Sequence, residues 1–238
     1  VTERAAVFEA LGLDRFIVIP FTPAFARLRG ETFVREVLVE RIGLREIVVG
    51  YDHAFGRGRE GDPHLLERLG AELGFAVDVI PAQIVAQHVV SSSEVRALLD
   101  AGDVAQAAHL LGRPYSLAGR VVHGDARGKA IGFATANLAL EHDRKVVPKV
   151  GVYAVRVALG EERFGGMMNI GVRPTFGGVD VRLEVHLFDF ERDLYDRVLR
   201  VEFVERIRDE RRFEGVGALV EQLSRDRERC IDALRGVS

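Results

Sequence analysis

The 238-residue sequence has one cysteine, no tryptophan and no surplus of basic residues. The lone Cys230 excludes an internal disulfide and a cysteine-based metal site. A formal net charge of −3 argues against non-specific nucleic-acid binding, which normally requires a basic surplus. No apolar run is long enough for a membrane span, and no signal peptide opens the chain. We therefore expect small-molecule substrates, no nucleic-acid or membrane partner and a cytoplasmic location, and we leave a homo-oligomer possible.

The first half of the chain, up to about residue 112, alternates helical and strand patterns. Hydrophobic residues make up 47% of the sequence and charged residues 29%, as in ordinary globular domains. The expected helices are 2–11, 31–42 and 63–73, and the expected strands are 15–19, 46–50 and 75–80. Short apolar strands that alternate with helices predict a parallel sheet covered on both faces, in an α/β domain.

Two loops of this half carry candidate ligand-binding residues. Gly50, Asp52 and Phe55 follow the second predicted sheet strand, where α/β folds bind ligands. Residues 91–96 open a helix with three serines and an arginine, and a helix N-terminus can bind an anion. The alternative interpretation is N-capping by serine beside a solvated arginine.

The second half, from residue 113, is rich in predicted strands. Glycine and proline within 111–115 mark the boundary, which gives domains 1–112 and 113–238. The expected strands are 118–123, 151–159, 163–170, 181–189 and 198–204, several of them alternating. Sequential strands joined by turns predict an antiparallel β-barrel. A helix is expected over 214–234, with an apolar stripe from Val216 to Leu234 and Cys230 as a small core residue beside it.

The stretch 121–138 combines glycines, basic residues and a Thr-Ala-Asn triplet. Glycine lets backbone N–H groups approach phosphate oxygens, because no Cβ is in the way. The candidate phosphate-binding residues are Gly124, Arg127, Gly128, Lys129 and Gly132. In the extended segment that follows, Thr135 and Asn137 point to one face and offer oxygen ligands that suit Mg²⁺. The alternative is a glycine-rich hairpin with no ligand.

Several motifs follow one another in a recognisable order. The segment 119–138 reads G-x-V-x-x-G-x-x-R-G-x-x-x-G-F-x-T-A-N-L, and GVYA, NIGVRPTF, EVHLFDF and DLY follow at 151, 169, 184 and 193. Together with Ile207-Arg208 and Phe213, they resemble the riboflavin kinase domain of the bacterial bifunctional riboflavin kinase/FAD synthetase. The loops at 50–59 and 91–96 resemble motifs of its other half, the FMN adenylyltransferase.

The resemblance implies a fold, a reaction and a set of ligands. The fold is a partial nucleotidyltransferase-like (Rossmann-like) domain with a parallel sheet, followed by an antiparallel β-barrel domain with a C-terminal helix. The kinase converts riboflavin and ATP, with Mg²⁺, to FMN and ADP. In the intact protein the FAD synthetase half converts FMN and ATP to FAD.

The resemblance also implies roles for individual residues. Glu184 matches the catalytic base, and Thr135 and Asn137 match the Mg²⁺ ligands. The ATP-binding residues of the kinase would be Gly124, Arg127, Gly128, Lys129, Gly132 and Tyr195. The flavin-binding residues would be Asn169, Arg173, Thr175, Arg208 and Phe213. The adenylyltransferase site would contain Gly50, Asp52, Phe55, Ser91, Ser92, Ser93 and Arg96. His186 is a second possible base beside Glu184, and a phosphate-side or structural role is the alternative for it.

The sequence departs from the family pattern at three places. No two of its seven histidines are three residues apart, so the H-x-G-H motif is absent, and we expect either a fragment or a half that has lost adenylylation. Ala134 replaces the usual proline before Thr135, and Asp196 replaces the usual glycine after D-L-Y. These departures leave a second hypothesis open, a flavin-binding module without turnover.

Overall fold

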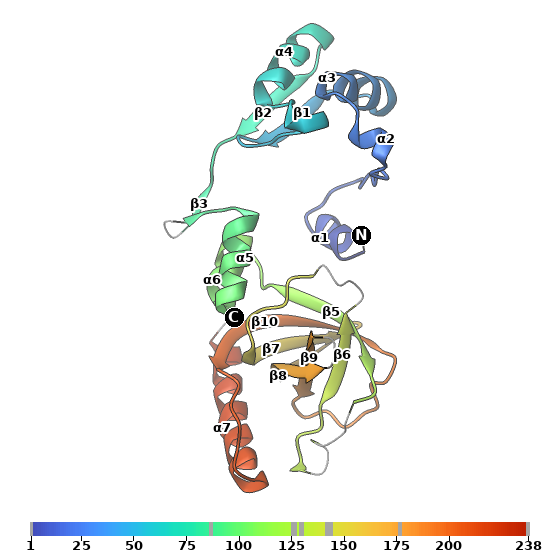
Figure 1. Ribbon diagram of the computed structural model, residues 1–238. Helices are drawn as coiled ribbons and strands as arrows, with labels where there is room; N and C mark the ends of the chain where they lie inside the picture. Colours follow the sequence, from blue (N-terminus) through green and yellow to red (C-terminus); the bar gives the residue numbers. More distant parts are fainter. Residues whose placement is uncertain are drawn as a thin grey trace. The chain divides into compact units, whose positions relative to one another are not determined.

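The protein is described by a computed structural model that divides into two compact units, 1–84 and 85–238 (Figure 1). The structure describes residues 2–85, 88–124, 128, 131–140, 145–175 and 178–236, without the side chains of 2, 173–175 and 178–179. None of the helices in these described ranges is long and apolar enough to cross a membrane. The two units are treated separately below.

The first unit contains a small parallel sheet covered by helices. Its elements are α1 (Thr2–Ala10), α2 (Pro23–Ala26), α3 (Gly30–Thr32), η1 (Phe33–Ile42), β1 (Glu46–Gly50), η2 (Arg57–Arg59), α4 (Pro63–Leu73) and β2 (Ala76–Ile80). β1 pairs with β2 in parallel from Glu46↔Ala76 to Gly50↔Ile80. The core consists of Val34, Val49, Leu66, Leu69 and Phe75. The α/β prediction and its parallel pairing are confirmed.

Two predictions for this unit need correction. The apolar segment 15–19 forms no strand, and the side chains of residues 16–19 are 37–57% exposed. A strand is stable only with a partner for its backbone hydrogen bonds, and β1 and β2 pair only with each other among the described residues. The helix expected over 31–42 is a π-helix from Phe33 to Ile42, where a plain α-helix was expected.

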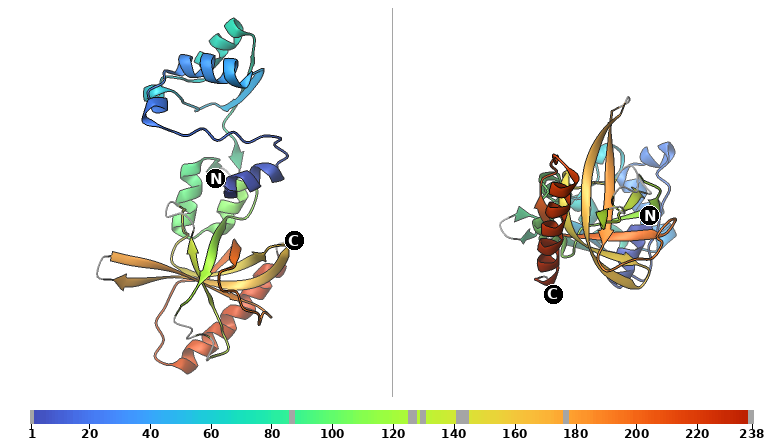
Figure 2. Two further views of the ribbon diagram at one scale, coloured as in Figure 1. Left: turned by 90° about the vertical axis from the view of Figure 1, so that its right-hand side faces the viewer. Right: turned by 90° about the horizontal axis from the view of Figure 1, so that it is seen from below.

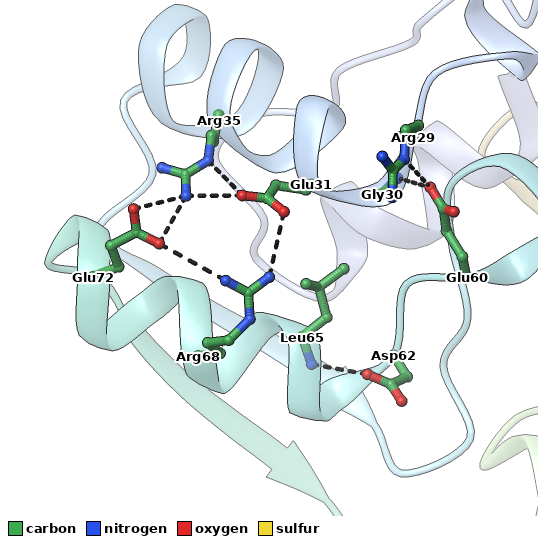
Figure 3. A network of polar contacts seen from close by, with 9 residues as sticks. All are labelled: Arg29, Gly30, Glu31, Arg35, Glu60, Asp62, Leu65, Arg68 and Glu72. Atoms are coloured by element: carbon green, nitrogen blue, oxygen red, sulfur yellow. Dashed lines mark hydrogen bonds and ion pairs between the residues drawn. The ribbon is translucent and has the colours of Figure 1, made fainter.

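Ion pairs join the π-helix η1 to α4 on the surface of this unit (Figure 3). Arg35 contacts Glu31 one turn back at 2.9 Å and Glu72 of α4 at 2.7 Å. Arg68 of α4 reaches Glu31 at 3.3 Å. The Arg35 hydrogen bond holds the pKa of the Glu31 carboxyl below its usual value. Because these side chains are 31–56% exposed, solvent screens the ion pairs and the network adds little stability.

The second unit is a closed antiparallel barrel, and its α-helices in the described part of the chain are α5 (Ser92–Ala101), α6 (Val104–Leu111) and α7 (Val216–Arg235). Its strands are β4 (His88–Val89), β5 (Ser116–Val122), β6 (Ala136–Leu140), β7 (Gly151–Leu159), β8 (Glu162–Thr175), β9 (Gly178–Leu187) and β10 (Val198–Arg208). The short β3 (Ile84–Val85) crosses the division between the units. The barrel order is β10-β5-β6-β9-β8-β7, and β10 closes it by pairing with β7. The predicted barrel and C-terminal helix are confirmed.

Alternation along the strands separates the barrel interior from its outer face. Leu183, Val185 and Leu187 of β9 are buried in the barrel core. Glu184 and His186 lie between them and therefore face outward. Helices α5 and α6 also bury Leu99, Val104 and Ala107 against this core. The compact unit thus begins before α5, and the domain boundary at residue 112 stays a prediction.

Strand β8 continues to Thr175, beyond the predicted end at residue 170, and includes residues 169–175 of the motif that begins at Asn169. Its last residues pair with β9 from Gly171↔Arg182 to Thr175↔Gly178. Residues 171–175 have no described partner on the other side, because the β7–β8 ladder ends at Ile170. Proline has no backbone N–H to donate to a neighbouring strand. Pro174 is tolerated in this two-stranded arm because one edge of the strand needs no such donor. The arm extends from the barrel in Figure 2.

Helix α7 packs against β7, β8 and β10 through a face that is more polar than expected. Val216, the first residue of the predicted apolar stripe, is 63% exposed. The fully or nearly buried residues of the helix are Gln222, Asp226 and Cys230. They are spaced at four-residue intervals and form one line, flanked by Leu223, Ile231 and Leu234. Cys230 is a core residue, as predicted.

Burial gives a direct test of this helix packing. Burial, and then Asp226, raises the pKa of the Cys230 thiol to about 12. Only the thiolate reacts readily, so at about pH 8 we expect almost no labelling of the native protein by a thiol reagent. The guanidinium-unfolded chain should react with one equivalent at once. Rapid stoichiometric labelling of the native protein would contradict the packing of α7.

Candidate active site

Polar residues from three neighbouring strands form a row across the outer face of the barrel. Asn137 of β6 is paired with Glu184 of β9, and Glu184 is paired with Asn169 of β8. The row continues through Val152 of β7 to Arg208 of β10. Directly paired residues have Cβ atoms about 4.5–5.5 Å apart. The strand register therefore places an amide, a carboxylate and a second amide side by side.

A cavity of about 390 Å³ lies over this row, beside α7. We call it the helix-side cavity. Seven of the predicted site residues line it: Gly128, Thr135, Asn137, Asn169, Glu184, Arg208 and Phe213. Its apolar walls are Ile131, Phe133, Val152, Met167, Leu219 and Leu223. A cavity that combines apolar walls with several convergent polar groups suits a flat ligand with an apolar body and polar substituents.

A second cavity of about 470 Å³ lies on the other side of the same strand end. We call it the loop-side cavity, because residues 190–195 form much of its wall. The predicted residues Gly124 and Tyr195 line it, together with Val185 and Leu187. The Tyr195 ring stacks on His123 with a centroid distance of 3.8 Å. Of the predicted ATP-binding residues that the structure describes, Gly124 and Tyr195 therefore line the loop-side cavity. Gly128 lines the helix-side cavity, and Gly132 lines neither.

Thr135 and Asn137 line both cavities. They stand at the start of β6, where the two cavities adjoin. A hydroxyl and an amide carbonyl are neutral oxygen donors of the kind that Mg²⁺ accepts alongside substrate phosphates. Among the described residues no group of three His, Cys, Asp or Glu could hold a metal ion. The residues present therefore fit a magnesium ion that is carried largely by a phosphorylated ligand.

Two glycines allow the backbone to approach these donors closely. A Cβ on Gly124 would lie 2.1 Å from Asn137 Nδ2. A Cβ on Gly128 would lie 2.1 Å from the carbonyl oxygen of Phe133 and 3.7 Å from Thr135 Oγ1. Glycine is needed at both places because any side chain would displace the segment that carries Thr135 and Asn137. Gly132 has a φ of 83° and lines neither cavity.

The segment before Thr135 is held by His186. The His186 ring lies with Nδ1 2.8 Å from the Ala134 carbonyl oxygen, which only accepts hydrogen bonds, so Nδ1 carries the proton. This contact supports the structural role for His186. It restrains Ala134, which lacks the fixed φ of the proline usual at this position.

The turn after Tyr195 adopts the geometry that a family glycine would favour. Asp196 has a φ of 62°, in the left-handed region that aspartate tolerates better than most residues. Its backbone N–H donates to the Val121 carbonyl at 3.0 Å. Arg120 Nη1 donates to the Asp196 carbonyl at 2.6 Å. The replacement of glycine is accommodated without loss of the turn.

Several predicted residues cannot be placed in the site. Arg127 and Lys129 lie outside the described residues. Arg173 and Thr175 belong to the backbone of the β8–β9 arm, and their side chains are not described. Their roles stay predictions.

The predicted adenylyltransferase residues fall in both units. Gly50 ends β1, and Asp52 and Phe55 follow it at the carboxyl end of the parallel sheet. Phe55 packs so closely on Gly61 that a Cβ there would lie 2.6 Å from the Phe55 ring. The loop position is the one that α/β folds use for ligands.

The serines belong to the second unit. Ser91 caps α5, because its Oγ accepts from the Glu94 N–H at 3.2 Å, so the capping interpretation holds for Ser91. Ser92, Ser93 and Arg96 are exposed in the first turns of that helix. An adenylyltransferase role for these residues stays a prediction.

Sequence reasoning missed the residues that build the cavity walls. Phe133 precedes β6, Met167 lies on β8, and Leu219 and Leu223 lie on α7. Apolar residues give no signal of which cavity they will line. Of the wall residues 190–194, Phe190, Asp193 and Leu194 lie in the motifs EVHLFDF and DLY, but the motifs predict no site role for any of them. A signal was available for Arg211, which shares a short segment with Arg208 and Phe213.

Comparison with known proteins decides the family. The family model described as riboflavin kinase matches residues 111–234, and the one described as FAD synthetase matches residues 1–94. The bifunctional riboflavin kinase/FMN adenylyltransferase of Escherichia coli K12 is 42% identical over 227 residues, which are 94% of this chain and 71% of that protein. The chain belongs to the bifunctional riboflavin kinase/FMN adenylyltransferase family.

Other members of the riboflavin kinase/FMN adenylyltransferase family are similarly related. The Bacillus subtilis protein of the same name is 36% identical over 228 residues, covering 94% of this chain and 71% of that protein. A crystal structure of a Streptococcus pneumoniae protein named a macrolide-efflux protein has 33% identity and a TM-score of 0.86. It covers 95% of this chain and 73% of that one. The likeness supports the fold described above.

The close approach of Gly124 to Asn137 gives a test of the site. A Gly124→Ala variant should push the Asn137 amide away from its position. We expect kcat for FMN formation to fall about tenfold or more, as when a positioned side chain is displaced. Gly217→Ala is the matched control, because a Cβ there meets nothing within 4 Å and alanine favours the helix. Steady-state rates of both variants check this. Equal rates would mean that Asn137 does not need its observed position.

Proposed function

We propose that the second unit is a riboflavin kinase, which transfers the γ-phosphoryl group of ATP to a hydroxyl of riboflavin. One observation carries the proposal: two cavities adjoin at Thr135 and Asn137, and Glu184 lies next to Asn137 in the strand register. Family membership supports the same reaction. Phosphoryl transfer needs two ligands held in line with little covalent participation by the protein.

The linings of the two cavities suggest which ligand each one binds. The helix-side cavity has apolar walls and the polar row, which suits a flavin ring with its hydroxylated chain directed at Glu184. The loop-side cavity has Gly124 and Tyr195, which suits ATP with its phosphates near the start of β6. The acceptor hydroxyl and the γ-phosphoryl group would then meet beside Thr135 and Asn137.

The Thr135 hydroxyl and the Asn137 amide oxygen would hold the magnesium ion. When bound, the ion neutralises the charge that develops on the phosphate oxygens during transfer. The protein's contribution is to fix these two oxygens through the β6 backbone, the His186 contact and the two glycines. Because the Thr135 and Asn137 oxygens are neutral, they would leave the positive charge of the magnesium ion available to the phosphates.

Glu184 would act as the general base. Its carboxylate takes the proton of the riboflavin hydroxyl as the hydroxyl oxygen forms a bond to the γ-phosphorus. The bond between that phosphorus and the bridging oxygen of ADP breaks, and its electron pair stays on ADP. The products are FMN and ADP, and the proton leaves from Glu184 to solvent.

The first unit supports a second proposed activity, the transfer of an adenylyl group from ATP to FMN to give FAD. Residues 1–94 match the FAD synthetase family model. Gly50, Asp52 and Phe55 lie just past the carboxyl end of a parallel strand, the place where such sheets bind nucleotides. To test this activity, the chain is incubated with FMN and ATP, and FAD and pyrophosphate are measured by chromatography. If no FAD is formed, adenylylation by this chain is contradicted.

Replacement of Glu184 tests the kinase proposal. In Glu184→Gln the side chain keeps its size and loses its basicity, so kcat for FMN formation should fall about 10²–10⁴-fold while the riboflavin KM changes little. Chromatographic rates at saturating ATP and Mg²⁺ provide the measurement.

Glu161→Gln serves as the control, because Glu161 lies in the exposed turn between β7 and β8, away from both cavities. It should match the parent. A Glu184→Gln enzyme with parental kcat would rule out Glu184 as the base. Flavin binding without any FMN formation by the parent would instead favour a non-catalytic flavin-binding module.

A further inference from the structure

A line of buried polar side chains connects α7 to the helix-side cavity. Asp226 has no exposed surface, and Gln222 is 9% exposed. Asp226 Oδ2 accepts from Arg208 Nε at 2.8 Å and from Nη2 at 2.7 Å. Asp226 Oδ1 accepts from Gln222 Nε2 at 2.7 Å, and Gln222 Oε1 accepts from Arg211. Each carboxylate oxygen of Asp226 therefore accepts from a different neighbour, Oδ2 from Arg208 and Oδ1 from Gln222.

These contacts fix Arg208 in a single orientation. Nε and Nη2 bond Asp226, and Nη1 donates to the Asp209 carbonyl at 2.8 Å. The guanidinium carbon also lies 5.8 Å from the centre of the Phe213 ring. Arg208 thus lies over the Phe213 ring while its N–H donors are held by the helix and the turn.

The buried polar line of α7 also holds Arg211 and Phe213, which line the helix-side cavity. Arg211, bonded to Gln222, lies with its guanidinium carbon 4.9 Å from the centre of the Phe213 ring. Phe213 is therefore flanked by two arginines, and each arginine is bonded to the α7 polar line. Arg208, Arg211 and Phe213 all line the helix-side cavity, whereas Asp226 and Gln222 do not.

We propose that Asp226, assisted by Gln222, is a positioning residue for the flavin, which acts by holding Arg208 and Phe213 against the helix-side cavity. The inference rests on the proposed kinase function, in which that cavity binds riboflavin. A helix interface needs no buried carboxylate for stability, since apolar residues of similar volume usually serve as well or better. The charge here is instead placed to orient an arginine in a ligand cavity.

This role predicts a selective effect on one substrate. No residue of 208–223 lines the loop-side cavity. A change at Asp226 should therefore weaken riboflavin binding and leave ATP binding nearly unchanged. A merely structural role would lower stability and spare both KM values of the folded protein, or would alter them together.

The test is Asp226→Asn, measured with riboflavin and ATP as separate variable substrates. The asparagine cannot accept from both Arg208 and Gln222 as the carboxylate does, so Arg208 loses part of its support. We expect the riboflavin KM to rise about tenfold, the ATP KM to stay within about twofold and kcat to stay within about threefold. Riboflavin fluorescence titration should show the same loss of affinity in the absence of ATP.

Asp232→Asn is the matched control on the same helix, because the Asp232 side chain is 78% exposed and forms a surface ion pair with Arg235. Gln222→Leu is the second variant, since it keeps the Arg208–Asp226 pair and removes only the support from the amide. It should raise the riboflavin KM about two- to fivefold.

The outcomes separate this inference from the proposed function. Unchanged riboflavin KM and affinity in folded Asp226→Asn overturn the positioning role; if that variant does not fold, an unchanged Gln222→Leu overturns it. Parallel rises in both KM values also overturn it. Absence of FMN formation by the parent chain overturns the kinase function instead, and the fluorescence titration still decides the role of Asp226.

Discussion

The register of β6, β9 and β8 is the constraint on which the site depends. It pairs Asn137 with Glu184 and Glu184 with Asn169, so three polar groups share the outer face of the barrel. Each of these residues lies between inward-facing apolar neighbours such as Leu183 and Val185. A slip of one residue would turn the apolar set outward and the polar set into the core. The burial energy of the barrel therefore holds the polar row in place.

A second layer of contacts tightens the end of this row. Gly124 and Gly128 let the chain approach Asn137 and Thr135, and His186 holds the carbonyl just before Thr135. Helix α7 supports the opposite end through Asp226 and Arg208. The site is thus held from both sides of the cavity, and the departure at Ala134 removes only one of several restraints. Such support keeps donors and acceptors in position before any ligand binds.

Features set by local pattern could be predicted from the sequence. The alternation of β9 placed Glu184 and His186 on the outer face, and the helix at 63–73 and the strand at 151–159 have the bounds that their patterns indicated. Motif order pointed to the residues that the two cavities bring together. Asp196 kept the left-handed turn that its glycine counterpart would make.

Features set by distant partners could not be predicted. Segment 15–19 has strand composition and lacks a pairing partner in the described chain, which no local pattern reveals. Part of the expected apolar stripe of α7 packs against the core, but the buried polar line beside it was not predicted, because Asp226 is matched to an arginine 18 residues earlier in the chain. The extension of β8 past Pro174 likewise depends on β9. The cavity walls could not be predicted for the same reason, because their residues come from several elements that are far apart in the sequence.

The most direct test of the account is to incubate the purified chain with riboflavin and ATP, with Mg²⁺ or with a chelator, and to quantify FMN and ADP by chromatography. The account predicts FMN and ADP in equal amounts, dependent on Mg²⁺. Riboflavin that binds and returns unphosphorylated, with Mg²⁺ present and the protein folded, would contradict it.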